Sequence, residues 1–138
     1  MSEKKTRIII CLNESAAAEN AVKLAKKHAK VFDANVHIIT SFAQRSDVKE
    51  KDADKMHQAS SLLEKVKQDF LDDGIKCVTR LIVNENSPGE NILQYAENNA
   101  IDEIIIGVEK TSKVGKAVFG STAQFVILGA TCPVVCTK

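Results

Sequence analysis

Apolar residues in this chain alternate between two spacings, one typical of strands and the other typical of helices. Residues 7–12 (Arg-Ile-Ile-Ile-Cys-Leu) form an almost continuous apolar run, which predicts a strand covered on both faces. The segment after Ser15 instead repeats apolar residues every three or four positions, with charged residues between them: Ala18, Ala21, Val22, Ala25, Ala29 and Phe32. That spacing predicts an amphipathic helix.

The same alternation continues to the end of the chain. Further strands are predicted at residues 36–42, 77–83, 102–106 and 133–136. A second helix is predicted from its apolar stripe at residues 56–70; its start is expected within the polar segment 44–55, which also forms a loop, and its end before Gly74. Further helices are predicted from Ser87 onward and at 121–128, where Gly129 is expected to end the helix. The start at Ser87 has three agreeing signals, because a capping Ser is followed by Pro88 and, three residues after the cap, by Glu90.

This order of elements predicts one α/β domain over residues 1–138. Alternating strands and helices form a doubly wound, mainly parallel sheet with helices on both faces. If the first strand lies in the middle, the five strands take the order 3-2-1-4-5, and the winding reverses between strands one and four. Ligands bind beyond the carboxyl ends of the strands at such a reversal. We therefore expect the loops 12–15 and 107–121 to face one crevice.

The second of these loops has the composition of a phosphate-binding segment. Residues 107–122 contain three of the six glycines of the chain and end in Gly120, Ser121 and Thr122 at a helix start. The first backbone N–H groups of a helix have no partner within it, so they bind anions readily. The loop lysines, whose positive charge would attract an anion, are Lys110, Lys113 and Lys116.

Several of these residues also have a purely structural interpretation. Ser121 and Thr122 could cap the helix without touching a ligand, and the lysines could form a solvated surface. Asn13 and Ser15 are expected to cap the first helix, a role compatible with ligand contact. Nothing in the sequence places a histidine beside a carboxylate or a nucleophile, so no catalytic role is assigned to His28, His37 or His57.

Composition narrows the class of protein. The 19 basic and 18 acidic residues leave a formal net charge of +1, which argues against a nucleic-acid partner. No apolar run approaches the roughly 20 residues that cross a bilayer, and the charged N-terminus leads directly into a strand. We therefore expect a soluble cytoplasmic protein with no membrane partner. The four cysteines, which have neither zinc-site nor CxxC spacing and are expected to be buried free thiols, are Cys11, Cys77, Cys132 and Cys136.

The glycine-rich loop also resembles that of a known family. Gly107, two residues, Lys110, nine residues and then Gly120-Ser121 are similar to the Gly-x2-Gly-x9-Gly-Ser/Thr loop of the universal stress protein family. The segments 86–90, 100–107 and 132–136 also fall where that family has them, so the resemblance covers essentially the whole chain. It implies a cytoplasmic, flavodoxin-like α/β protein, usually a homodimer, that often holds ATP or AMP, with or without Mg²⁺, and is connected with survival under stress.

The resemblance implies a set of nucleotide-binding positions. The positions that match the phosphate and ribose contacts are Gly107, Gly120, Ser121 and Thr122, and those on the adenine side are Asn13 and Ser41. The full candidate set, including neighbours and loop lysines, is Leu12, Asn13, Ser15, Ser41, Ile106, Gly107, Lys110, Lys116, Gly120, Ser121 and Thr122.

Two positions depart from the family pattern. Lys110 stands where the family has its second glycine, so its side chain could block a close backbone approach or could reach a phosphate. Asn13 stands where an Asp is usual, and it keeps an acceptor oxygen but loses the charge.

Three functions remain open. The first is a regulatory protein that binds ATP or AMP and changes its affinity for an unknown protein partner. The second is slow ATP hydrolysis or self-phosphorylation, although no general base or metal-binding carboxylate cluster is apparent and no efficient enzyme is expected. The third is a nucleotide-free homodimeric scaffold. Under all three we expect a homodimer through the terminal strand, residues 133–137, because the backbone groups of an edge strand are unpaired.

Overall fold

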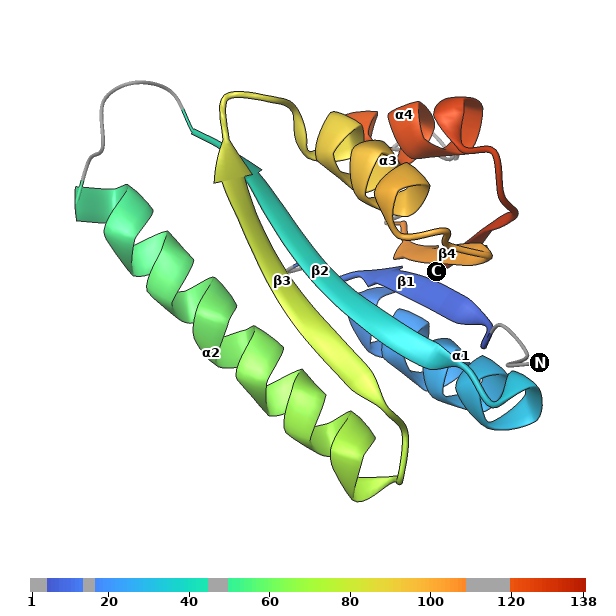
Figure 1. Cartoon of the computed structure of the whole chain (residues 1–138). Coiled ribbons are helices and arrows are strands. Elements are labelled where there is room, and N and C mark those ends of the chain that lie inside the picture. The colour runs from blue at the N-terminus through green and yellow to red at the C-terminus, as the bar shows by residue number, and fades with distance from the viewer. Residues whose placement is uncertain (1–4, 14–16, 45–49, 109–119) are drawn as a thin grey trace.

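The computed structural model describes residues 5–13, 17–44, 50–108 and 120–138 (Figure 1). Within these ranges strands and helices alternate along the chain: β1 Arg7–Cys11, α1 Ala17–Phe32, β2 Asn35–Ala43, α2 Glu50–Asp72, β3 Cys77–Asn84, α3 Pro88–Asn98, β4 Glu103–Gly107, α4 Ser121–Gly129 and β5 Val134–Thr137. The strands pair in parallel in the order β3-β2-β1-β4-β5. The predicted α/β fold and its strand order are confirmed.

The central strands are apolar throughout because both of their faces are covered. Successive side chains of a strand point to opposite faces of the sheet. Ile8 and Ile10 of β1 pack with α1 and α2, whereas Ile9 and Cys11 pack with α3 and α4. The continuous apolar run of the sequence therefore serves two separate cores, one on each side of the sheet.

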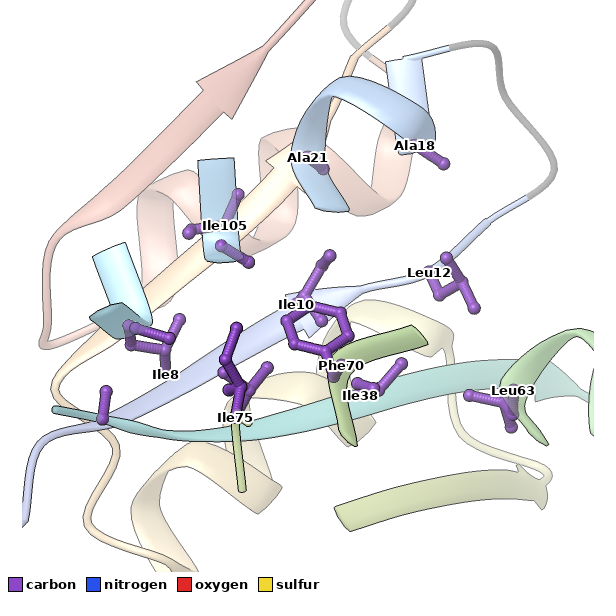
Figure 2. Packing of buried hydrophobic residues seen from close by; sticks show 14 residues of the cluster. Ile8, Ile10, Leu12, Ala18, Ala21, Ile38, Leu63, Phe70, Ile75 and Ile105 are labelled. Carbon is purple, nitrogen blue, oxygen red and sulfur yellow. The ribbon is translucent and has the colours of Figure 1, made fainter. Parts of the chain in front are cut away.

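The core between the sheet and the helices α1 and α2 is closely packed (Figure 2). The face of α1 toward the sheet consists of alanines, whose small side chains let the helix approach the strands: Ala18, Ala21, Ala25 and Ala29. In α2, Phe70 is completely buried and lies close to Ile10 and Ile38 in Figure 2. Small residues on one helix and large ones on the other fill this layer.

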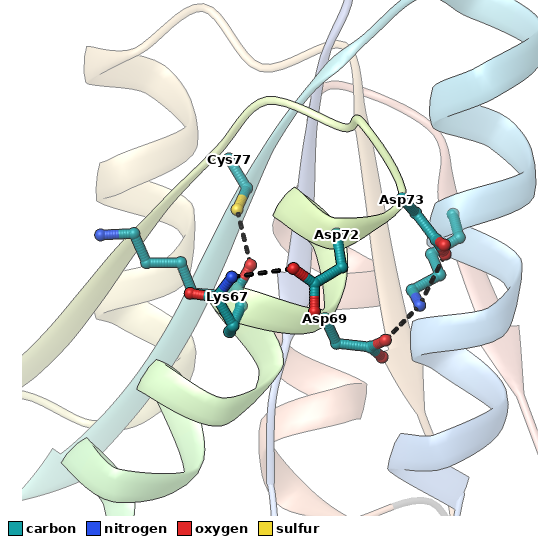
Figure 3. A network of polar contacts seen from close by, with 7 residues as sticks. Lys67, Asp69, Asp72, Asp73 and Cys77 are labelled. Carbon is teal, nitrogen blue, oxygen red and sulfur yellow. Dashed lines mark hydrogen bonds and ion pairs between the residues drawn. The ribbon is translucent and has the colours of Figure 1, made fainter.

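A charged cluster joins α1 to the end of α2. Lys26 Nζ lies 2.8 Å from Asp69 Oδ1 and 2.9 Å from Asp73 Oδ2, and Figure 3 shows both carboxylates at the end of α2. Burial acts to lower the pKa of Lys26, but the hydrogen bonds to the two carboxylates outweigh it and raise that pKa. The hydrogen bond from Lys26 likewise lowers the pKa of Asp73.

One predicted helix limit is confirmed and another is wrong. The helix α2 begins at Glu50, inside the polar segment 44–55 in which its start is predicted, and it ends at Asp72, before Gly74. Gly129 does not end α4 as a left-handed cap, since it is the last helical residue and the cap is Ala130, with φ of −71°. A Cβ atom on Gly129 would lie 2.5 Å from Leu93 Cδ1, so this glycine allows α4 to pack closely against α3.

The sheet has two different edges. The strand β3 forms one edge with eight residues and carries the exposed Arg80 near its middle. The strand β5 forms the other edge with only four residues, as the sequence predicts for its terminal strand. Among the described helices, none combines the length and the hydrophobicity that a membrane span needs.

Candidate functional site

The carboxyl ends of β1 and β4 lie next to each other. Cys11 pairs with Ile106 in the register of these parallel strands. Leu12 and Gly107, the residues that follow this pair, therefore leave the sheet side by side. The expectation that the first and fourth strands are neighbours at the reversal of the winding is confirmed.

A cleft of about 230 Å³ opens at this edge of the sheet, beside β1, β2 and the first half of α2. Its lining residues are Leu12, Asn13, Thr40, Ser41, Phe42, Lys55, Gln58, Ala59 and Leu62. Leu12, Asn13 and Ser41 belong to the candidate set from the sequence, and the structure brings them together although nearly thirty residues separate Asn13 from Ser41. Apolar walls with a few polar groups are typical of small-molecule sites.

Two hydrogen bonds fix the floor of the cleft. The Leu12 backbone N–H donates to the Ile39 carbonyl at 2.8 Å. The hydroxyl of the buried Thr40 donates to the Leu12 carbonyl at 3.0 Å. The chain beyond β1 is thereby held against β2, so the exposed Asn13 is presented at the cleft from a fixed backbone.

The side chain of Ser41 takes part in a polar network on the α3 side of the sheet. The hydroxyl oxygen of Ser41 accepts a hydrogen bond of 2.9 Å from Asn91 Nδ2. Asn91 is only 3% exposed, and it also exchanges two hydrogen bonds with the side chain of Asn84. Ser41 thus lines the cleft from a strand whose position this network fixes.

The helix α2 supplies the outer wall, which the sequence did not assign to the site. Lys55 Nζ lies 4.6 Å from the centre of the Phe42 ring, a cation–π contact across the cleft. The α2 residues of the lining, which share one face of the helix because they are spaced three and four apart, are Lys55, Gln58, Ala59 and Leu62. This spacing shows in the sequence that the four residues share one face of the helix. It does not show which strand that face covers, so the sequence could not assign them to the cleft.

Gly107 and Ile106 have structural roles. A Cβ atom on Gly107 would lie 2.8 Å from the carbonyl carbon of Ala17 and 2.9 Å from its oxygen, so the start of α1 needs a glycine there. Ile106 is 2% exposed and belongs to the core beneath α3 and α4. Packing within the chain accounts for both residues without a ligand.

Gly120, at the start of α4, has no packing role of the kind that Gly107 has. Gly120 is the N-cap residue, so Ser121 is the first helical residue and the interpretation of Ser121 or Thr122 as the cap is wrong. Gly120 has φ of −62°, and a Cβ atom on it would have no described neighbour within 4 Å. Neither the backbone conformation nor the packing of the described residues requires a glycine there. Ser121 is exposed and Thr122 is half-buried.

Three candidate residues lie outside the described residues: Ser15, Lys110 and Lys116. Most of the loop between β4 and α4 lies outside them as well. The described part of the predicted site therefore comprises the cleft, the end of β4 and the first turn of α4.

The structure brings one histidine beside a carboxylate, a contact that the sequence did not indicate. His28 Nδ1 of α1 lies 2.6 Å from Glu103 Oε1 of β4, although 75 positions separate the two residues. His37 Nδ1 of β2 lies 2.6 Å from the Tyr95 hydroxyl of α3. Both contacts join a helix to a strand, and the linear sequence does not show such pairings.

The four cysteines are free, as predicted, but they are not all buried. Cys11 is buried, Cys77 and Cys132 are half-buried, and Cys136 is exposed on β5. Burial raises the pKa of the Cys11 thiol to about 12, which keeps it protonated at neutral pH. Among the described residues, no group of three or more His, Cys, Asp or Glu side chains could hold a metal ion.

Comparison with known proteins gives relatives that match along nearly the whole chain. A sequence model of the universal stress protein family matches residues 5–138. The universal stress protein MJ0531 of Methanocaldococcus jannaschii is 29% identical over 140 residues, covering 96% of this chain and 81% of the relative.

Two solved structures from Archaeoglobus fulgidus have the same fold. A universal stress protein from that organism superposes with a TM-score of 0.84 at 28% identity, covering 96% of this chain and 98% of the other. A structure in complex with dAMP gives a TM-score of 0.79 at 25% identity with the same coverage.

Proposed function

This chain belongs to the universal stress protein family, and from that premise we propose that it binds an adenine nucleotide at the carboxyl edge of its sheet. The observation that carries the proposal is the cleft at the ends of β1 and β2, which Leu12, Asn13 and Ser41 line together. The dAMP complex of a relative with the same fold supports the choice of ligand.

The cleft suits the base of the nucleotide. Leu12, Phe42 and Leu62 provide apolar surface for a flat ring. Asn13 and Gln58 supply donors and acceptors that can pair with the edge of adenine. At about 230 Å³ the cleft is smaller than the roughly 300–1,000 Å³ that hold a complete drug-sized ligand, which fits a site for one part of the nucleotide.

We assign the phosphates to the start of α4. The first backbone N–H groups of this helix lack acceptors within it, and no described residue lies within 4 Å of where a Cβ atom on Gly120 would be. The hydroxyls of Ser121 and Thr122 would add two donors. Lys110 and Lys116 would add positive charge, and Gly107 and Ser15 would complete the ribose and phosphate contacts that the family resemblance implies.

The proposed output is regulatory. ATP or AMP, with or without Mg²⁺, would change the affinity of this cytoplasmic protein for a protein partner during stress. A cation–π contact such as that of Lys55 with Phe42 is weak enough to rearrange when a base enters the cleft. That rearrangement would link ligand binding to the position of α2.

The base site is tested by filling the cleft. Ala59→Trp places a large side chain at a lining position, and Ala53→Trp places the same side chain at an exposed position of the same helix. Calorimetry on nucleotide-stripped protein should show ATP and AMP affinity falling about tenfold or more for Ala59→Trp and unchanged for Ala53→Trp. Absence of binding to the unmodified protein at high micromolar nucleotide would refute the proposal.

The phosphate site is tested at Thr122. Thr122→Val removes the hydroxyl at nearly constant volume, and Thr131→Val makes the same change at an exposed position after α4. We expect Thr122→Val to weaken ATP binding about five- to tenfold, since a hydrogen bond to a charged group is lost. Equal affinities for the two variants would remove Thr122 from the site.

A second candidate function is a homodimeric interaction module, which the exposed apolar residues of α4 favour. Ile127 is 39% exposed and Leu128 is 86% exposed. Pairing of β5 with a second copy across a twofold axis would satisfy its free edge. Analytical ultracentrifugation should show a dimer, and Cys136→Arg on β5 should weaken it while Val31→Arg on α1 should not. A monomer at micromolar concentration would contradict the assembly.

Slow ATP hydrolysis or self-phosphorylation stays a prediction from the resemblance alone. Mass spectrometry after incubation with ATP distinguishes it from simple binding, because a phosphorylated chain gains the mass of a phosphoryl group. An unchanged chain mass together with unchanged ATP would leave binding as the function.

A further inference from the structure

A second hollow lies at the opposite end of the sheet from the nucleotide cleft. It has a volume of about 320 Å³ and lies where β1, β2 and β3 begin, at the lower right of Figure 1. Its lining residues are Arg7, Asn35, Val36, His37, Lys76, Cys77, Val78 and Asn99. We call this the basic hollow. It is larger than the cleft of about 230 Å³ to which we assign adenine.

Strand register gathers positive side chains in the basic hollow. Arg7 pairs with Asn35 across β1 and β2, and His37 pairs with Val78 across β2 and β3. By the alternation of side chains, these residues and Arg80 share the face of the sheet that α3 covers in part. Val78 is 47% exposed, so this face remains accessible at β3.

The positive charges in the basic hollow are not balanced by acidic lining residues. Arg7 and Lys76 line it, and among its described lining residues there is no Asp or Glu. Asp102 accepts a hydrogen bond of 2.9 Å from the backbone N–H of Arg7. Burial lowers the pKa of His37, and the charges of Arg7 and Arg80 lower it further. The surroundings of His37 are therefore electrostatically positive and favour an anion.

Two of the basic side chains are already held in place. Arg7 Nη1 donates to the Asn99 carbonyl at 2.7 Å, which fixes the guanidinium beside the end of α3. The 2.6 Å contact between His37 Nδ1 and the Tyr95 hydroxyl fixes the imidazole ring and leaves Nε2 for a ligand. Donors that are oriented in advance lose little entropy when they bind.

We propose that the basic hollow is a second ligand site, distinct from the nucleotide cleft, that binds a phosphate group. Arg7, Lys76 and Nε2 of His37 would donate to the phosphate oxygens. The ligand would be inorganic phosphate or a small phosphate monoester.

The experiment is a nuclear magnetic resonance titration of the His37 ring with inorganic phosphate or methyl phosphate, each with the unmodified protein and with Ala59→Trp, in which the nucleotide cleft is filled. The His37 signals should respond to phosphate in both cases, so the result does not depend on whether the nucleotide cleft is functional. Phosphate should also raise the pKa of His37, because its charge offsets those of Arg7, Arg80 and Lys76 around the ring. The contact between the Tyr95 hydroxyl and Nδ1 of His37 should be unchanged when phosphate binds. A response to both phosphate probes indicates a phosphate-group site, and a response to methyl phosphate alone indicates a monoester site.

The variants change exposed lysines, so that the fold of the protein is not disturbed. Lys76→Gln changes an exposed residue and should weaken phosphate binding about tenfold, because one charge-assisted contact is lost. Lys65→Gln makes the same change at an exposed position of α2 and should leave the affinity unchanged. No response of His37 to millimolar phosphate or methyl phosphate, or an equal loss of affinity for Lys76→Gln and Lys65→Gln, would overturn the proposal.

Discussion

The two faces of the sheet are covered in different ways. The α1 and α2 face is mainly an apolar layer of alanines and large side chains, with polar contacts at Thr40, between His28 and Glu103, and around Lys26. The α3 and α4 face contains a network centred on the buried Asn91, which contacts Ser41 and Asn84, and the half-buried contact of His37 with Tyr95.

The two faces depend on different kinds of interaction. An apolar layer depends mainly on volume and tolerates swaps that conserve it. A buried polar network depends on the identity of each partner, because one lost partner leaves the others unsatisfied. We therefore expect substitutions on the two faces to fail for different reasons.

The largest effect is expected for Phe70→Ala on the α1 and α2 face. Phe70 is completely buried, so its truncation should cost about 3–5 kcal/mol in the free energy of unfolding. Urea denaturation provides the measurement. Phe125→Ala on α4, where the ring is 44% exposed, is the matched change on the other face and should cost clearly less. Similar costs would show that the two cores are equally tight.

Asn91→Ala is the corresponding test of the polar network. It removes the partner of Ser41 and Asn84, and we expect a loss of about 1–3 kcal/mol in the free energy of unfolding. Gln94→Ala, at an exposed position of the same helix, should have little effect. If Asn91→Leu had the same free energy of unfolding as the unmodified protein, the polar network would not be needed to stabilise this face.

Replacing two glycines by alanine tests how rigid the packing is on each face. Gly107→Ala would bring a Cβ atom against the Ala17 backbone, which cannot move without α1, and should cost about 1–3 kcal/mol. Gly129→Ala would meet only the end of the Leu93 side chain, which can rotate away. Thermal denaturation should therefore show a lower midpoint for Gly107→Ala and a nearly unchanged one for Gly129→Ala. The reverse order would contradict this comparison.

The smallest effects are expected in the dependence of stability on pH, and the two faces should differ in the range concerned. The pKa of His37 is lowered from 6.5 in the fold, so the unfolded chain takes up a proton first as the pH falls. The contribution of neutral His37 to the free energy of unfolding is therefore fully present above pH 6.5. It is lost as the pH falls from 6.5 through the lower pKa of the folded state. Urea denaturation at several pH values should show this slope, and His37→Asn should remove it.

The cluster on the other face responds only to stronger acid. The pKa of Asp73 is lowered from 3.8 by its hydrogen bond to Lys26, followed by the charges of Lys26 and Lys30. Its contribution is present above pH 3.8 and is lost as the pH falls through the lower folded value. Lys26→Met should abolish this acid dependence but leave the slope near neutral pH. Loss of both slopes would mean that the two faces are coupled.

The sequence predicted the fold well because its strands and helices differ clearly in apolar spacing. The order of strands followed from the alternation of elements, and the carboxyl-edge position of Leu12 and Gly107 followed from that order. The contact of His28 with Glu103 could not be predicted, because it depends on where α1 lies along β4. Lys55 and Gln58 were missed for the same reason, since only the placement of α2 brings them to the cleft.

The β3 edge has a consequence for how large an assembly can become. A sheet that accepts neighbours on both sides can grow into a continuous ribbon. Arg80 stands exposed near the middle of the eight residues of β3, and a like charge on an incoming copy would repel it. The short β5 carries no charged residue among Val134–Thr137. If copies of the chain associate by strand addition, as we propose, only the β5 side favours it, which would limit the assembly to a closed pair and oppose filament formation.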